Sequence, residues 1–561
     1  MCLPKSETKM SCDLPRYRWR KPLFENILDK SVYGYVRYIL ENRQLSESHI
    51  ERFLSISIDN FDPKFENDRV ERAIHIFKNM INADEPIGIF GDYDADGVTS
   101  VAILCSFLSY LGKKFIFKLP TRDEGYGIRV EVLEFFKDMG INNIVVLDSG
   151  SNSREVWQTA RKMGLNLLYL DHHEILCDLE KDLNLINPHL WNGDLLCSAG
   201  VIFRFLMLLD IFKNCCEIFP TLLELATIGT VGDSIELLGD SRIIVKLGLN
   251  QLKNSTIPGI VNFFNIKMPY ISIEDLMFYL VPLINSAGRV GKPDLALSFL
   301  LEKNFHKSIE KCNLLESLNQ KRKSIQSQFF SICMSILNES LYSPHVHFMR
   351  LDNCPKGIIG PLASRLACSY KKPFFLCSGE QLLYGSGRSP GNDIDLIELY
   401  NQIKSEYPAI NEHFVNFGGH QGAVGFTIKK DAFPEIKKRF ERFRIRESIP
   451  FLNIDIIFDG FSIDDNFFRA LKAMTPFGFG NQKVLVCTKG IAFNNLESSI
   501  DYSEVVVFRH YNNIRWIIKN NRQILKDLLN AKFDVVWEAK VKNDGIDFEF
   551  LDAKVVFLEC C

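Results

Sequence analysis

Between about residues 84 and 240, short apolar runs alternate with longer stretches whose hydrophobic residues have helical spacing. Four of the runs are predicted as buried strands, at residues 87–90, 114–119, 144–147 and 167–170. Strands that alternate with helices are typical of a parallel sheet covered by helices. The pattern therefore predicts an α/β fold for this part of the chain.

The pattern changes twice in the second half of the chain. A polar segment between residues 302 and 340 has few helix breakers and is predicted to be a long connecting helix. A second α/β part follows, with a strand at residues 373–377 and a glycine-rich loop at 385–389. After about residue 450, short apolar strands at 505–508, 514–518 and 533–538 predict a β-rich module of the barrel type.

The composition is that of an ordinary globular protein, with 46% hydrophobic and 24% charged residues. The net charge of -3 argues against a basic nucleic-acid-binding tail, so any binding of DNA must be local. The most apolar stretch, residues 201–212, is interrupted by Arg204 and Asp210, and no secretion signal is evident. We therefore expect a cytoplasmic protein without a membrane segment.

Fifteen cysteines are scattered along the chain without a C-x-x-C pair. This spacing suggests neither a zinc site nor a disulfide framework. We expect reduced thiols that mostly fill the core.

Three carboxylates at alternating positions, Asp92, Asp94 and Asp96, come just after the first predicted strand. Carboxylates this close repel one another unless cations lie between them. A calcium loop of the EF-hand kind would need Glu near residue 103, which is Ile. A solvated acidic turn remains an alternative for this segment alone. A helix is predicted to open at Val98 and to end near Gly112, with amides that face an anion.

Three further apolar runs end in possible ligands, each expected at the end of a strand. These ligands are Asp148, the triplet Asp171, His172 and His173, and Asp233. Asp148 and Asp233 taken alone are equally well explained as helix caps. As a set, the carboxylates and imidazoles indicate an oxygen-rich site for Mn²⁺ or Mg²⁺. Two such cations could serve the hydrolysis of a phosphoester.

These segments resemble, in order, the four phosphoesterase motifs of the DHH superfamily, and in particular its RecJ family of single-strand-specific exonucleases. The resemblance extends over most of the chain, because residues 282–289 resemble a fifth motif and residues 418–425 the DHHA1 signature. Residues 474–481 resemble the entry into an OB-type domain. The resemblance implies five parts. They are an N-terminal helical segment (1–75), a DHH domain (76–305), a connecting helix (306–342), a DHHA1 domain (343–449) and an OB-type domain (450–561).

By the same resemblance, the activity is 5′→3′ hydrolysis of single-stranded DNA to mononucleotides in recombination and repair. The implied metal ligands are Asp94, Asp96, Asp148, His172 and Asp233. Asp92 would complete the site and His173 would lie at or near the phosphate. Which of the first three aspartates bind metal directly stays open. The polar residues 149–152 and 286, and Gly232 before Asp233, depart from the family pattern without removing a ligand.

Other residues are candidates for holding the DNA strand. Arg289, expected after a glycine-containing turn, is able to contact a phosphate in two places, although a structural ion pair is the alternative. The resemblance places Arg122, Ser386 and Arg388, expected on glycine-rich loops, in a pocket for a 5′-terminal phosphate. Gly418, Gly419 and His420, expected on a turn, would let backbone amides approach a phosphate.

Two weaker features have structural alternatives. The basic run at residues 437–446 is best explained as a solvated helix face, although it could steer DNA. Trp516, Tyr502 and Phe508 could stack on unpaired bases or pack in a core.

Two competing functions are considered. One is a DHH phosphodiesterase of short oligoribonucleotides or cyclic dinucleotides, and the other is a non-catalytic single-strand-binding replication scaffold of the same fold. Retention of every acidic motif residue and both histidines argues against the scaffold. The resemblance implies single-stranded DNA as partner, together with a RecQ-type helicase and a single-strand-binding protein. A monomer is expected because no heptad seam is evident.

Overall fold

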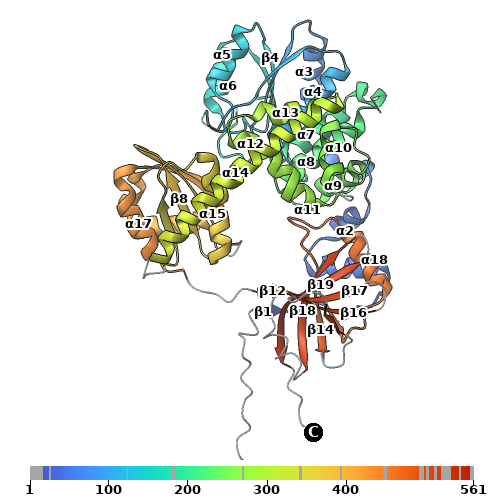
Figure 1. Cartoon of the computed structure of the whole chain (residues 1–561). Helices are drawn as coiled ribbons and strands as arrows, with labels where there is room; N and C mark the ends of the chain where they lie inside the picture. The colour runs from blue at the N-terminus through green and yellow to red at the C-terminus, as the bar shows by residue number, and fades with distance from the viewer. Residues whose placement is uncertain are drawn as a thin grey trace, which may run out of the picture. The chain divides into compact units, whose positions relative to one another are not determined.

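The structure is a computed structural model of the chain, shown in Figure 1. It describes residues 17–24, 27–122, 124–179, 183–215, 217–267, 271–339, 344–391, 394–445, 451–491, 498–500, 505–510, 514–519, 532–542 and 545–555. The described residues form two compact units. The larger unit lies within Asp62–Ile235 and Leu247–Glu447, and the β-rich unit lies within Met1–Phe61, Glu236–Lys246 and Ser448–Cys561.

The larger unit contains a five-stranded parallel sheet in the order β3-β2-β4-β5-β6. Its strands are β2 (Ile87–Phe90), β3 (Phe115–Lys118), β4 (Asn143–Leu147), β5 (Asn166–Leu170) and β6 (Leu185–Ile186). The four predicted strands are confirmed to within one residue at either end. Because β3 and β4 lie on opposite sides of β2, the strand order reverses there, and open α/β sheets bind ligands at the carboxyl ends beside such a reversal.

Helices cover this sheet. They include α3 (Asp68–Asn82), α4 (Ala95–Tyr110), α5 (Val130–Asp138), α6 (Arg154–Lys162) and α7 (Ser198–Met207), and α8 (Phe219–Gly232) lies outside α4 and α7. The helix predicted to open at Val98 begins earlier, at Ala95, because the Asp94 carboxylate caps it. Asp94 Oδ1 accepts hydrogen bonds from the backbone N–H groups of Asp96 and Gly97, each at 3.1 Å.

The prediction that Asp233 follows a strand is wrong. The apolar run before it forms α8, and Asp233 is the residue after the last turn of that helix. Helix α8 packs against α4 and α7 and is buried along most of its length. A helix buried on all sides is hydrophobic all round, so its sequence lacks the polar face that would distinguish it from a buried strand.

Further helices follow in the larger unit. They are α9 (Gly239–Leu252, with residues up to Lys246 in the β-rich unit), α10 (Pro258–Lys267), α11 (Ile273–Asp275), a π-helical turn (Leu276–Leu280), α12 (Val281–Arg289), α13 (Pro293–Leu301) and α14 (Phe305–Glu339). The 35-residue α14 confirms the predicted connecting helix. The prediction that Arg289 follows a turn is wrong, because Arg289 is the last residue of α12.

A second five-stranded sheet lies in the order β10-β11-β9-β8-β7. Its strands are β7 (His347–Arg350), β8 (Phe374–Ser378), β9 (Leu382–Arg388), β10 (Phe414–His420) and β11 (Ala423–Lys429). The helices around it are α15 (Lys356–Tyr370), α16 (Leu396–Glu406) and α17 (Phe433–Arg442). The predicted glycine-rich loop at 385–389 and the predicted turn at 418–420 are wrong, because these residues belong to β9 and β10 apart from Ser389.

The β-rich unit contains a seven-stranded sheet in the order β13-β14-β18-β19-β17-β16-β15. Its strands are β13 (Ile456–Asp459), β14 (Leu485–Ile491), β15 (Ser498–Ile500), β16 (Val505–His510), β17 (Ile514–Lys519), β18 (Phe533–Val541) and β19 (Ile546–Val555). A separate pair joins β1 (Arg18–Arg20) to β12 (Phe451–Asn453). Helices α1 (Val32–Asn42), α2 (Glu47–Leu54) and α18 (Asp465–Met474) contribute to its core.

One of the three aromatic residues considered for base stacking lies in that core. Trp516 is only 2% exposed and packs against Trp537 and Phe548. A buried ring has no face free for a base. Tyr502 and the side chain of Phe508 lie outside the part of the chain that the structure describes.

Short 3₁₀ helices complete the described elements. They lie at Ile58–Asn60, Pro63–Phe65, Pro188–Leu190, Asp210–Asn214, Pro408–His413 and Lys430–Ala432. The described cysteines are free thiols and, except for Cys177 and Cys368, are buried, as expected. None of the described helices has both the length and the hydrophobicity needed to cross a bilayer.

Candidate metal centre

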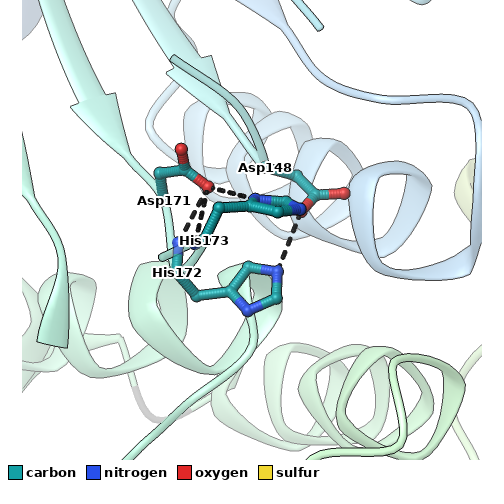
Figure 2. A group of neighbouring side chains, drawn as sticks. All are labelled: Asp148, Asp171, His172 and His173. Carbon is teal, nitrogen blue, oxygen red and sulfur yellow. Dashed lines mark hydrogen bonds and ion pairs between the residues drawn. The ribbon is translucent and has the colours of Figure 1, made fainter. Parts of the chain in front are cut away.

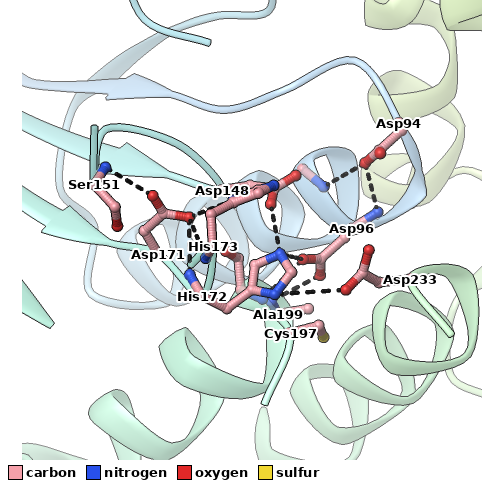
Figure 3. A network of polar contacts seen from close by, with 12 residues as sticks. Asp94, Asp96, Asp148, Ser151, Asp171, His172, His173, Cys197, Ala199 and Asp233 are labelled. Carbon is pink, nitrogen blue, oxygen red and sulfur yellow. Dashed lines mark hydrogen bonds and ion pairs between the residues drawn. The ribbon is translucent and has the colours of Figure 1, made fainter. Parts of the chain in front are cut away.

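The carboxyl edge of the parallel sheet gathers all eight acidic and histidine residues predicted as ligands. They form three overlapping groups, and within each group the possible ligand atoms lie within 4.8 Å of one another. The groups are Asp148, Asp171, His172 and His173; Asp96, His172 and Asp233; and Asp92, Asp94 and Asp148. Figure 2 shows the first group and Figure 3 its connection to the others. Asp233 therefore reaches the site from the end of a helix.

His172 lies in the middle of these groups. Its Nε2 is 3.3 Å from Asp148 Oδ1 and 3.7 Å from Asp96 Oδ2, and its Nδ1 is 3.5 Å from Asp233 Oδ2 (Figure 3). Burial and the neighbouring His173 lower the pKa of His172 to about 3, so its imidazole is neutral at neutral pH. Its Nε2 has no hydrogen-bond partner among the described residues. A neutral imidazole nitrogen that faces carboxylates is suited to bind a metal ion.

Asp96 is fixed by the start of α7. Its two carboxylate oxygens accept hydrogen bonds from Ser198 N at 2.8 Å and from Ala199 N at 2.9 Å. These N–H groups belong to a helix N-terminus, where negative charge is favoured. Burial and the charge of Asp94 nevertheless raise the pKa of Asp96 to about 6. The carboxylate is therefore held in place but repelled by its neighbours.

Asp148 follows β4 in a left-handed backbone conformation, with φ of 57°. Its burial and the charges of Asp96, Asp94 and Asp92 raise its pKa well above the usual range. Asp92 is also buried and has a raised pKa, and its Oδ1 has no hydrogen-bond partner among the described residues. Crowded carboxylates with unsatisfied oxygens need positive charge between them. This donor set fits two divalent cations of the Mn²⁺ or Mg²⁺ kind.

Asp171 differs from the other carboxylates in its contacts, which are made with His173 and with backbone N–H groups. Its Oδ1 lies 2.7 Å from His173 Nδ1 and accepts a hydrogen bond from His172 N, and its Oδ2 accepts one from Ser151 N (Figure 2, Figure 3). Burial alone would raise its pKa, but the hydrogen bond and charge of His173 hold it below the usual range. Burial likewise opposes protonation of His173, but Asp171 raises the pKa of His173 to about 9. Asp171 therefore orients the two histidines.

Tyr126 and Asn285 also contact the site, although the sequence predicted no role for either residue. The Tyr126 hydroxyl lies 2.6 Å from His173 Nε2 and donates to the backbone oxygen of Asp148. The side-chain oxygen of Asn285, on α12, accepts a 2.8 Å hydrogen bond from Ala95 N. Asn285 lies within the motif at residues 282–289, which is the sequence signal that could have identified it.

A pocket of about 990 Å³ opens beside the acidic groups and is lined by both Tyr93 and Tyr126. Arg122, Arg289, Ser386, Arg388 and Gly418 also line it, whereas Gly419 and His420 do not. Arg388 Nη1 donates to Ser386 Oγ, and the Arg122 guanidinium lies 4.6 Å from the centre of the Tyr93 ring. Among the ion pairs of the described residues, none joins any of the three arginines to a carboxylate. The pocket is therefore suited to a polyanion.

The basic run at residues 437–446 does not contribute to this pocket. Lys437 and Arg439 lie on α17 and pair with Glu441 and Glu435 on the same helix. These pairs agree with a solvated helix face. Arg446 lies outside the described residues.

Adding Mn²⁺ to the metal-free protein is expected to raise its melting temperature more at pH 8 than at pH 5. Burial and nearby carboxylates raise the pKa of Asp96 to about 6 and that of Asp233 to about 8, from an ordinary value of 3.8. Between the ordinary pKa and the raised pKa of each aspartate, the folded state holds more protons than the unfolded chain. The stability of the metal-free protein therefore falls as the pH rises from about 4 to about 8.

The Mn²⁺ effect should follow the opposite course, because protons and cations compete for the same oxygens. Scanning calorimetry at both pH values, with Mn²⁺ or with EDTA, checks this. A melting temperature that Mn²⁺ raises equally at pH 5 and pH 8 would contradict the arrangement of charges.

Comparison with known proteins agrees with the site. Residues 86–230 match the family model "DHH family, N-terminal domain". The chain is 26% identical over 441 residues to the single-stranded-DNA-specific exonuclease RecJ of Bacillus subtilis, which covers 76% of this chain and 54% of that protein. It is 29% identical over 397 residues to the RecJ of Escherichia coli, which covers 66% of this chain and 68% of that protein. The chain thus spans about half the length of the first relative.

Solved structures show the same fold. The RecJ of Thermus thermophilus in complex with Mn²⁺ matches with a TM-score of 0.74 at 20% identity, covering 97% of this chain and 80% of that one. The exonuclease RecJ bound to manganese matches with a TM-score of 0.56 at 25% identity, covering 67% of this chain and 95% of that one. Residues 86–230 therefore match the N-terminal domain of the DHH family, in a chain that is similar to RecJ proteins in sequence and in fold.

Proposed function

We propose that this protein is a metal-dependent exonuclease that hydrolyses single-stranded DNA in the 5′→3′ direction and releases mononucleotides. One observation carries the proposal. An acidic and histidine cluster suited to two cations lies beside a pocket lined by three arginines that form no ion pair with a carboxylate among the described residues. Tyr126, which contacts His173 of the cluster, also lines that pocket. The names of the RecJ relatives supply the substrate class.

The proposed metal ligands are Asp94, Asp96, Asp148, His172 and Asp233, with Asp92 completing the site. Bound Mn²⁺ or Mg²⁺ would supply an activated water as nucleophile and would offset the charge of the phosphodiester.

The chain's own residues prepare the substrate around the ions. Asp171 keeps His173 oriented and protonated, because its charge raises the pKa of His173 to about 9. The protonated imidazole is proposed to lie near the phosphate. Arg289, at the end of α12, is proposed to stabilise the charge that develops on the phosphoryl oxygens during hydrolysis.

Replacing Arg388 by Gln is expected to weaken cleavage of 5′-phosphorylated strands by about tenfold or more and that of 5′-hydroxyl strands little. Arg388, Ser386 and Arg122 line one pocket, and we propose that they hold the 5′-terminal phosphate. A charge-assisted hydrogen bond is lost only when that phosphate is present. Initial rates on the two strands measure the ratio.

Arg365→Gln is the matched control, because Arg365 is exposed on α15 and stacks on Phe330 away from the pocket. Equal loss on both strands in Arg388→Gln would reject the assignment of a terminal-phosphate pocket.

The five-part division is proposed to hold, with the connecting helix, 306–342, between the DHH part (76–305) and the DHHA1 part (343–449). The N-terminal segment (1–75) and the OB-type part (450–561) complete it. Single-stranded DNA is the proposed partner, with a RecQ-type helicase and a single-strand-binding protein as further partners and a monomer as the working state.

Digestion of end-labelled strands tests the proposal. A 3′-labelled strand, a 5′-labelled strand and the matched blunt duplex are incubated with Mn²⁺, Mg²⁺ or EDTA. Metal-dependent release of mononucleotides from the 5′ end of single strands alone is the expected result. Cleavage of dinucleotides but not of long strands would favour the short-oligonucleotide phosphodiesterase, and binding without cleavage would favour the replication scaffold.

A further inference from the structure

One face of the strands β9, β11 and β10 is open toward the pocket. Side chains on a strand alternate between faces, so Tyr384, Ser386 and Arg388 share one face of β9. Ser386 is paired with Gly425 on β11, which in turn is paired with Gly418 on β10. A Cβ atom added at either glycine would meet no atom within 4 Å. The central row of this face is therefore a shallow trough without large side chains.

Tyr384 stands beside this trough. It is 39% exposed, and it lines the same pocket as Ser386 and Arg388. The Lys356 ammonium, at the start of α15, lies 3.9 Å from the ring centre and therefore occupies one face of the ring. An exposed aromatic ring beside a row of phosphate-binding candidates is the arrangement that single-strand-binding proteins use to stack a base.

The spacing along β9 agrees with the size of one nucleotide. Alternate residues on a strand lie about 6.6 Å apart, so the Tyr384 backbone is about 6.6 Å from that of Ser386 and about 13 Å from that of Arg388. A phosphate held between Ser386 and Arg388 would bring a nearby base within reach of the Tyr384 ring. Thr427 is paired with Tyr384, and the exposed Asn416 is paired with Thr427, so the two residues continue the row across the sheet and line the same pocket.

We propose that Tyr384 is a stacking platform for a nucleobase within the first two nucleotides of a strand whose 5′-phosphate lies at Ser386 and Arg388. This inference rests on the proposed function and adds a specificity-determining residue to it. Every base has an aromatic face, so the platform accepts any sequence. It requires, however, that a base be present, and it discriminates against strands that lack one near the 5′ end.

A binding cycle tests the proposal. Anisotropy measures the affinity of 3′-labelled, 5′-phosphorylated 12-nucleotide strands in Ca²⁺, with strands confirmed intact on a gel. One strand is complete, and the others carry a single abasic site at position 1, 2 or 8. The proteins are wild type, Tyr384→Ala, Tyr384→Phe and Tyr110→Ala, where Tyr110 is an exposed tyrosine of α4 outside this pocket.

Tyr384→Ala is expected to weaken binding of the complete strand by about 5- to 100-fold, the usual effect of losing one stacked base. An abasic site at position 1 or 2 should cost the wild type as much, and should cost Tyr384→Ala little more. Position 8 should show no such coupling. Tyr384→Phe should bind like the wild type, since the ring is kept, and Tyr110→Ala should also be unchanged.

Lys356→Gln separates stacking from charge. This variant should bind less tightly at low salt yet keep the coupling to the abasic position. Additive losses at every abasic position would overturn the stacking role while leaving the nuclease proposal intact. A wild-type protein that binds no strand at all would overturn both, so the two failures give different results.

Discussion

Replacing Asp148 by Asn is expected to reduce cleavage by about a thousandfold or more while raising the melting temperature of the metal-free protein. Loss of one ligand from a centre that contributes several kcal/mol of transition-state stabilisation corresponds to about this factor. The stability gain has a separate cause. Burial and four neighbouring carboxylates raise the pKa of Asp148 well above the usual range, so its charge destabilises the metal-free fold.

Asn is the suitable replacement at this position. The backbone of Asp148 has φ of 57°, a left-handed conformation that Asn tolerates better than most residues. Asp148→Ala removes the same charge but adds backbone strain, so its metal-free melting temperature should lie below that of Asp148→Asn.

Calorimetry of both variants, with and without Mn²⁺, measures these differences. Asp148→Asn should also lose most of the stabilisation by Mn²⁺. A metal-free Asp148→Asn that melts below the wild type would show that the cluster does not repel as described.

The parts of the site that follow strands could be predicted from the sequence. In β2, β4 and β5 a short, almost wholly apolar run is followed within two residues by an aspartate. Parallel strands end at the same edge of a sheet, so alternation of strands and helices was enough to bring these aspartates together. The carboxylate and imidazole side chains then restricted the expected metal to Mn²⁺ or Mg²⁺.

Other residues were chosen correctly but assigned to the wrong element. Asp233 ends a helix that is buried on all sides, and such a helix has the composition of a buried strand. Gly385 and Gly387 suggested a loop, but they lie inside β9. They are glycines because a Cβ at Gly385 would clash with Phe426 and one at Gly387 with Phe375. Glycine in a strand can thus mark close packing, and a single sequence does not distinguish the two uses.

The roles of Asp171 and Tyr126 depend on where their side chains point, and the spacing of residues along the sequence does not give this. Asp171 lies among the predicted ligands, yet its oxygens bind His173 and backbone N–H groups. Tyr126 reaches His173 from a separate loop, 47 residues earlier in the chain. Such contacts become visible only when the strands are assembled.

Two buried arginines are expected to respond oppositely to the same substitution. Burial lowers the pKa of both Arg242 and Arg289 to about 9. Arg242, in the β-rich unit, donates to four backbone oxygens, those of Phe53, Ala473, Met474 and Thr475. Arg289 donates to one among the described residues, that of Gly357. The nearby charges of Arg122, Arg322 and Arg388 repel it, and that of Asp94 attracts it.

Arg289→Met should therefore raise the melting temperature of the substrate-free protein and reduce cleavage by about a hundredfold or more. An apolar side chain of similar size relieves a buried charge that its neighbours compensate only in part, a gain of about 1 kcal/mol or more. The lost guanidinium is the group proposed to stabilise the developing phosphoryl charge, where removal of one such donor costs about 10²–10³ in rate.

Arg242→Met should instead lower the melting temperature. It leaves several buried carbonyl oxygens without donors, which costs about 3 kcal/mol of stability. Calorimetry of each variant beside its initial rate on single strands distinguishes the two cases. If Arg289→Met melted lower than the wild type, Arg289 would be a structural residue with hydrogen bonds of its own. An arginine kept at a cost to stability is instead what a site built to receive phosphate requires, since its charge is compensated more fully by a bound phosphate than by Asp94 alone.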